Sequence, residues 1–109
     1  MYKGVFGSEK RGKILLYLFT HGEAYPTEIA KAFQWYLNAV QNQLRNLESD
    51  GLVYSRLRGR TRLFGLNPRF PFYKEIKTIL EKMLVFVSEA DMEKLYRPRL
   101  RPRRSGKPV

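Results

Sequence analysis

The 109-residue sequence contains no cysteine and only one histidine, His21. The missing thiols exclude disulfides and thiolate metal sites, and one histidine cannot replace a metal site that needs several ligands. Asp50 and Asp91 are the only aspartates, and neither has a carboxylate or histidine partner at a spacing that supports catalysis. Because Gly22 follows His21 at a predicted helix end, we expect a capping or solvent-exposed role for the histidine side chain. The sequence therefore predicts no enzyme activity, no metal and no cofactor.

Long apolar segments are also missing. The longest uninterrupted apolar run, ILLYLF at residues 14–19, is far too short to cross a bilayer. The N-terminal MYKGVFGSEK lacks the apolar stretch and small-residue cleavage site of a secretory signal. We therefore expect a cytoplasmic protein without a membrane segment.

Acidic residues are few: 10 Asp and Glu stand against 21 Lys and Arg, which gives a formal net charge of +11. The imbalance is local, because residues 1–50 hold six basic and five acidic side chains (+1), whereas residues 51–109 hold fifteen and five (+10). A basic excess in one half of a chain favours a polyanionic partner, either nucleic acid or an anionic membrane surface. The length and the 43% hydrophobic content are those of one domain with one packed core.

The first helix signal begins at Ser8, a suitable N-cap for a helix that runs to about Thr20. Its apolar residues, 14–19, occupy most of the helix circumference rather than one stripe. A helix that is apolar nearly all round must be covered on more than one side. We therefore expect it to contact both the domain core and a second subunit.

Two further helices are predicted before residue 51. Pro26 fits the first position of a short helix, and apolar spacing predicts a longer helix from about residue 37 to 49. Gly51 ends the longer helix where a left-handed residue is wanted. The side chains expected to face inward are Ile29, Ala30 and Phe33 in the short helix and Leu37, Val40, Leu44 and Leu47 in the longer one.

The segment VYSRLRGRTRLF, residues 53–64, predicts two strands joined by Gly59 and Arg60. Arginine recurs at every second position, and no acidic residue interrupts the series. Because side chains alternate across a strand, we expect the hairpin to carry one basic face. Its members are Arg56, Arg58, Arg60 and Arg62.

A long helix is predicted from about Phe72 to Val87, after Pro68 and Pro71 end the second strand. Two apolar rows run along it. The row with four-three-four spacing is typical of a helix pair, so we expect it to form a dimer seam, while the other row covers the core. The seam consists of Ile76, Leu80, Met83 and Val87, and the core row of Phe72, Ile79 and Phe86.

The chain is expected to end in a short capped helical turn followed by a basic tail. Ser88 is a suitable cap for a short final turn through Tyr96. Residues 97–109, RPRLRPRRSGKPV, are rich in proline and arginine and have almost nothing to bury, so we expect a disordered basic tail. The predicted domain therefore covers residues 1–96.

Two short helices joined by a tight turn and followed by a basic hairpin make a winged helix-turn-helix. The segment PTEIAKAFQWYLNAVQNQLRNLESDGLVYSRLRGRTRLFGLN, residues 26–67, resembles the winged-helix transcriptional regulators of the ArsR and MarR type. The matching pieces are TEIAKAF, VQNQLRNLESDGLV and the glycine-tipped hairpin. The spacing L-x-x-L-x-x-x-G-L-V from Leu44 to Val53 is the most specific of them. The cysteine pair of metal-sensing ArsR relatives is absent from this chain.

The resemblance implies a dimer whose recognition helices enter successive major grooves of DNA, with the hairpins, or wings, alongside. Carried over by position, the recognition helix is about residues 37–49. Its outward face is rich in amides, which pair with adenine in the major groove, and it carries one arginine, which pairs with guanine. The residues expected on that face are Tyr36, Asn38, Ala39, Gln41, Asn42, Arg45 and Asn46.

The four wing arginines are expected to contact phosphates or to enter a minor groove. The alternative is a solvated edge strand that its charge keeps from aggregating. Lysine would serve that purpose equally well, yet all four residues are arginine, which favours contact with DNA.

The predicted fold is mainly α (α+β): a winged helix-turn-helix with a two-stranded β-hairpin wing and a long C-terminal dimerisation helix. The predicted function is sequence-specific binding of double-stranded DNA by a homodimeric prokaryotic transcriptional regulator. The alternative is a winged-helix module that docks protein or RNA inside a larger assembly. No residue pattern identifies a small-molecule effector.

Overall fold

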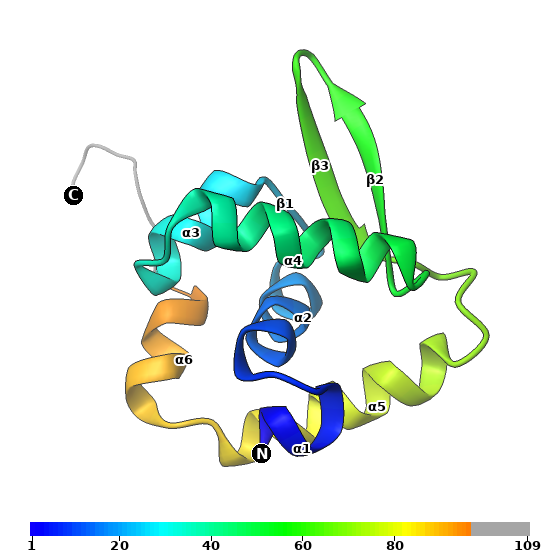
Figure 1. Cartoon of the computed structure of the whole chain (residues 1–109). Coiled ribbons are helices and arrows are strands. Elements are labelled where there is room, and N and C mark those ends of the chain that lie inside the picture. Colours follow the sequence, from blue (N-terminus) through cyan, green and yellow to red (C-terminus); the bar gives the residue numbers. More distant parts are fainter. Residues whose placement is uncertain (97–109) are drawn as a thin grey trace.

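A computed structural model describes residues 1–96 of the chain, and the predicted tail at 97–109 lies outside the described residues. The fold is mainly helical with a small antiparallel sheet, so the predicted winged-helix fold class is confirmed. In Figure 1, α2 lies in the middle of the domain, α4 crosses on one side, and α5 and α6 lie on the other. The elements in chain order are α1 (Tyr2–Phe6), α2 (Glu9–His21), β1 (Glu23–Ala24), α3 (Pro26–Phe33), α4 (Leu37–Ser49), β2 (Val53–Arg58), β3 (Thr61–Leu66), α5 (Tyr73–Met83), a 3-10 turn η1 (Leu84–Phe86) and α6 (Glu89–Tyr96).

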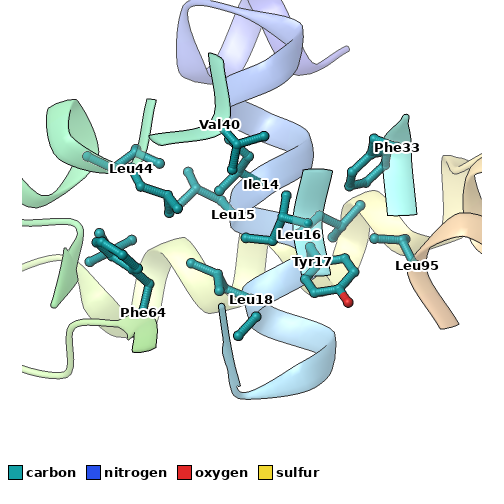
Figure 2. Packing of buried hydrophobic residues seen from close by; sticks show 14 of the residues in the cluster. Ile14, Leu15, Leu16, Tyr17, Leu18, Phe33, Val40, Leu44, Phe64 and Leu95 are labelled. Atoms are coloured by element: carbon teal, nitrogen blue, oxygen red, sulfur yellow. The ribbon is translucent and has the colours of Figure 1, made fainter. Parts of the chain in front are cut away.

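The central helix α2 begins as predicted. Ser8 is its N-cap, and the Ser8 hydroxyl accepts a hydrogen bond from the Arg11 amide at 3.0 Å. Residues 14–18 are all at most 1% exposed. Figure 2 shows their side chains in the middle of the core, with Val40 of α4 on one side and Leu95 of α6 on another.

The apolar circumference of α2 does not need the second subunit that was expected to cover part of it. The helix packs against α1, α4, α5, α6 and strand β3 of its own chain. Its apolar circumference is therefore buried within one protomer, because the short elements around it each cover one side.

Two short elements were not predicted: α1 and strand β1. Helix α1 packs against α2 at Gly12, where a Cβ atom would lie 2.8 Å from the ring of Tyr2. The missing side chain of Gly12 therefore makes room for Tyr2, which is only 8% exposed. Strand β1 pairs with β3 and extends the hairpin to three strands in the order β1-β3-β2.

Helices α3 and α4 lie close to their predicted bounds. Pro26 opens α3, and the side chain of Glu28 accepts a hydrogen bond from the Tyr25 amide at 2.8 Å. Gln34 ends α3 in the left-handed region with φ of 58°, and the Trp35 amide donates to the carbonyl of Ala30 at 2.9 Å. This compact turn sets the direction in which α4 leaves α3.

The predicted inward faces of these two helices are confirmed with one exception. Leu37 is 39% exposed, because it is the first residue of α4 and borders an open groove rather than the core. The buried members are Ile29, Ala30 and Phe33 of α3 and Val40, Leu44 and Leu47 of α4.

The wing, residues 53–66, projects beyond the rest of the domain (Figure 1). Gly59, with φ of 66°, and Arg60 form its turn, as predicted. Arg58 pairs with Thr61 across this two-residue turn. Even-numbered residues of β2 therefore share a face with odd-numbered residues of β3.

The prediction of a single basic face on the wing is therefore wrong. Arg56 pairs with Leu63 and shares its face with Arg58, whereas Arg62 pairs with Leu57 on the opposite face. The wing thus carries arginine on both of its faces and at its tip.

The two apolar rows of α5 are used in the opposite way to that predicted. Leu80 is fully buried and Met83 is 5% exposed, and both pack into the core of their own chain. The other two seam residues, Ile76 and Val87, are half-buried against the same core. The predicted core row is the exposed one, with exposures of 61% for Phe72, 36% for Ile79 and 75% for Phe86.

Helix α6 is attached to the end of α2. The Ser88 hydroxyl accepts a hydrogen bond from the Asp91 amide at 3.2 Å, which confirms the predicted cap. His21 stacks on Tyr17 with 4.0 Å between ring centroids, and its Nε2 donates to the carbonyl of Leu95. His21 is therefore part of the α2–α6 contact rather than a solvent-exposed side chain.

Candidate nucleic-acid interface

A groove of about 730 Å³ lies between the wing, the outward face of α4 and the beginning of α3. Three arginines border it together with apolar side chains, among them Leu37 and Phe64. Its lining residues are Tyr25, Pro26, Thr27, Leu37, Gln41, Arg45, Glu48, Arg60, Thr61, Arg62 and Phe64. The groove brings part of the predicted recognition helix together with one face and the tip of the wing.

The predicted outward face of α4 is open to solvent. Tyr36, the N-cap residue, is 88% exposed. The Arg45 guanidinium donates to the side-chain oxygen of Asn42 at 2.7 Å, so these two neighbouring groups hold each other in place. The exposed members of the predicted set are Tyr36, Asn38, Asn42, Arg45 and Asn46, and the half-buried members are Ala39 and Gln41.

One face of the wing is tied to α4. Arg62 donates to the Ser55 hydroxyl at 3.1 Å, and Ser55 donates in turn to the carboxylate of Glu48 on α4 at 2.7 Å. These bonds join the two elements that border the groove. The guanidinium of Arg62 therefore lies on the groove side of the wing.

The opposite face of the wing is tied to strand β1. Glu23 of β1 accepts two hydrogen bonds from Arg56, from Nε to Oε2 at 3.0 Å and from Nη2 to Oε1 at 2.9 Å. The hydroxyl of Tyr54 also donates to Oε2 of Glu23. The hydrogen bonds from Arg56 and then from Tyr54 lower the pKa of Glu23 to about 2, so this carboxylate stays charged in mildly acidic solution.

Sequence reasoning missed Glu23 as a member of the site. A strand of two residues has no periodicity, and Glu23 is separated from Arg56 by 33 positions. The remaining predicted arginines, Arg58 and Arg60, make no side-chain hydrogen bond or ion pair with any described residue.

Other kinds of site find no support among residues 1–96. No three His, Cys, Asp or Glu side chains in this range lie together so that they could hold a metal ion. In the same range, no helix has the length and apolar character needed to cross a membrane.

No protein-family model matches the chain, and no curated protein matches it in sequence. Solved structures do match. MepR, described as a transcription regulator of the Staphylococcus aureus multidrug efflux pump MepA, is 26% identical with a TM-score of 0.60, covering 87% of this chain and 76% of MepR. A mutant of S. aureus MepR bound to an oligodeoxyribonucleotide is 30% identical with a TM-score of 0.56, covering 83% of this chain and 72% of that one.

A third structure is similar in fold. YusO from Bacillus subtilis is 21% identical with a TM-score of 0.57, and the match covers 83% of this chain and 70% of YusO. The likeness extends over most of each protein rather than over the helix-turn-helix alone.

Proposed function

Because the chain belongs to the MarR-type winged-helix transcription regulators, we propose that it binds double-stranded DNA sequence-specifically and regulates transcription in the prokaryotic cytoplasm. The observation that carries this proposal is the amide-rich, solvent-exposed face of α4 beside a groove bordered by arginines. A relative that is 30% identical has been captured on an oligodeoxyribonucleotide. A net charge of +11 favours the same polyanionic partner.

In this proposal α4 enters the major groove. Asn38 and Asn42 present amides that match the donor and acceptor pattern of adenine, and Arg45 presents a guanidinium that matches guanine. Their side chains already lie on the exposed side of a helix whose opposite side is anchored in the core. The backbone that carries them is therefore ordered before binding, which favours affinity.

The wing lies beside the same duplex, because the wing and α4 border the same open groove. A sugar-phosphate strand separates a major groove from the adjacent minor groove. We propose that Arg60, at the turn, enters that minor groove, whereas Arg62 borders the groove between wing and helix.

We further propose a homodimer formed through the exposed apolar row of α5 and its surroundings. Phe72 and Ile79 border a shallow apolar groove of about 460 Å³ together with Val5 of α1. Val85 and Phe86 in η1 are 79% and 75% exposed. Large apolar side chains gathered on an exposed surface are typical of a region that another protein covers.

Selection of bound duplexes from a random pool, followed by sequencing, tests both parts of the proposal. A dimer places two recognition helices about 34–36 Å apart, so we expect a near-palindrome with that period. The selected duplex should bind more tightly than random DNA by several kcal/mol. A pool without an enriched sequence would instead favour a module that docks protein or RNA.

The dimer surface has its own test in sedimentation. The double variant Phe72→Glu with Phe86→Glu is expected to be monomeric, because it places two charges on the exposed apolar row. The control is Leu57→Glu, which changes an apolar side chain of the wing that is 63% exposed and is expected to leave the dimer intact. A wild-type protein that sediments as a monomer would contradict the dimer.

A further inference from the structure

Among the four arginines of the wing, Arg56 is the one that is hydrogen-bonded to a carboxylate of a described residue. We propose that Glu23 is a positioning residue of the wing, which holds Arg56 back from DNA and leaves the phosphate contacts of this face and the tip to Arg58 and Arg60. The inference rests on the proposed DNA-binding function. It assigns different roles to side chains that look equivalent in the sequence.

The pairing of Arg56 with Glu23 uses both carboxylate oxygens and one edge of the guanidinium. Two parallel N–H donors of the guanidinium meet the two oxygens of one carboxylate, at 3.0 and 2.9 Å. This bidentate geometry is the strong form of the arginine–carboxylate contact. It also closes the Nε–Nη2 edge of the guanidinium to a phosphate and leaves only the donors on the Nη1 side.

Glu23 is fixed by its surroundings rather than free to follow Arg56. Its backbone pairs with Gly65 of β3, and its Oε2 accepts a further hydrogen bond from Tyr54. Tyr54 lies across Gly65, where a Cβ atom would be 2.7 Å from the tyrosine hydroxyl. The absence of a side chain at position 65 thus allows the ring to reach the carboxylate.

An isolated exposed ion pair would be a weak restraint, and Arg56 is half exposed. Here the carboxylate is held in advance by a strand and by Tyr54, so little side-chain entropy is lost in forming the pair. If Arg56 moved to a phosphate, it would leave the charge of Glu23 unpaired beside the DNA backbone. Both effects favour the pair over the phosphate contact.

Arg58 and Arg60 differ from Arg56 in having no such partner among the described residues. Arg58 lies on the same face as Arg56 but one pair closer to the tip, opposite Thr61. Arg60 is part of the turn itself. Each guanidinium keeps all its donors available for phosphate oxygens.

The slope of log affinity against log salt tests the assignment, because each phosphate neutralised on B-DNA contributes about 0.9 to it. The protein is the full chain, and the probe is a duplex selected from the random pool. Arg60→Gln is expected to flatten the slope by about 0.9, whereas Arg56→Gln leaves it unchanged. Glu23→Gln is expected to steepen the slope by about 0.9, because it releases a guanidinium that can now meet a phosphate.

The double variant Glu23→Gln with Arg56→Gln should return the slope to the wild-type value. A purely structural role of Glu23 would weaken binding but would not add a phosphate contact that depends on Arg56. Unchanged urea denaturation would show that each variant is folded, and if Glu23→Gln does not fold, the comparison of Arg56→Gln with Arg60→Gln decides.

Two results would overturn the inference while the DNA-binding function stands. One is equal flattening by Arg56→Gln and Arg60→Gln, which would place Arg56 on a phosphate in the wild type. The other is a folded Glu23→Gln variant with an unchanged slope. A wild-type protein that binds no duplex would remove the proposed function and this inference with it.

Discussion

Helices α2 and α4 have the same length, 13 residues, but opposite relations to the solvent. Five successive residues of α2, 14–18, are at most 1% exposed, whereas α4 buries only Val40, Leu44 and Leu47 along one side. Helix α2 is enclosed by the elements that pack on it, whereas α4 is anchored by one row of buried side chains. A helix anchored in this way can change its outward side chains without losing its place in the fold.

The two helices also begin differently. Ser8 caps α2 through its hydroxyl, while Tyr36 at the start of α4 makes no side-chain hydrogen bond to the helix. Tyrosine is a poor N-cap compared with serine, threonine or asparagine. The start of α4 therefore gives up stability where it presents an exposed aromatic ring beside the candidate interface.

The largest expected effect lies in α2. Leu15→Ala should lower the free energy of unfolding by about 2–5 kcal/mol, because it leaves a cavity where the side chain is fully buried. Urea denaturation followed by circular dichroism measures this change. Asn42→Ala on the exposed side of α4 is the control and should stay within about 0.5 kcal/mol of wild type. Equal losses of unfolding free energy from both variants would show that the two helices do not differ in their contribution to stability.

The next effect concerns DNA rather than stability. Asn42→Ala and Arg45→Ala should each cost about 1–3 kcal/mol on the selected duplex and much less on random DNA. Since Arg45 donates to Asn42, the double variant should lose less than the sum of the two single losses. Titrations of the three variants on both kinds of DNA provide the measurement. Equal losses on selected and random DNA would show that α4 does not read bases.

The smallest effect has opposite signs in the two assays. Tyr36→Ser should raise the free energy of unfolding by about 0.5–1 kcal/mol, because the hydroxyl can accept from the free amides at the start of α4. The same change should weaken binding to the selected duplex if the exposed ring contacts DNA. Thermal unfolding and titration on one preparation compare the two. If the variant shows no gain in stability and no loss of affinity, the start of α4 does not exchange stability for DNA contact.

Much of the fold was predictable because its signals are local. Ser8, Pro26 and Gly51 mark helix ends by their own chemistry, and the apolar spacing of α3 and α4 identifies their buried sides. Strand β1 left no such signal, because two residues show no alternation. Its contribution to the site depends on a contact between residues 23 and 56 that chain folding alone brings together.

Two errors have different physical origins. The rows containing Leu80 and Ile79 on α5 are both apolar, so periodicity alone could not decide which one faces the core. The face of Arg62 could have been derived, since a two-residue turn pairs Arg58 with Thr61 and moves Arg62 to the other side. The regular spacing of the arginines suggested one face, but the two-residue turn places even residues of β2 on the same face as odd residues of β3.

The turn between α3 and α4 depends on Gln34, whose φ of 58° is the one positive value at a non-glycine position among residues 1–96. That conformation costs roughly 1–2 kcal/mol for an ordinary residue. Glycine would remove the strain but would also add about 0.5–1 kcal/mol of backbone entropy to the unfolded chain, so the net gain in stability is expected to be small. What would change is stiffness, because the joint between the two helices would sample a wider range of angles at nearly constant stability. Natural selection can thus tune how rigidly α4 is presented through a residue that need never touch its ligand.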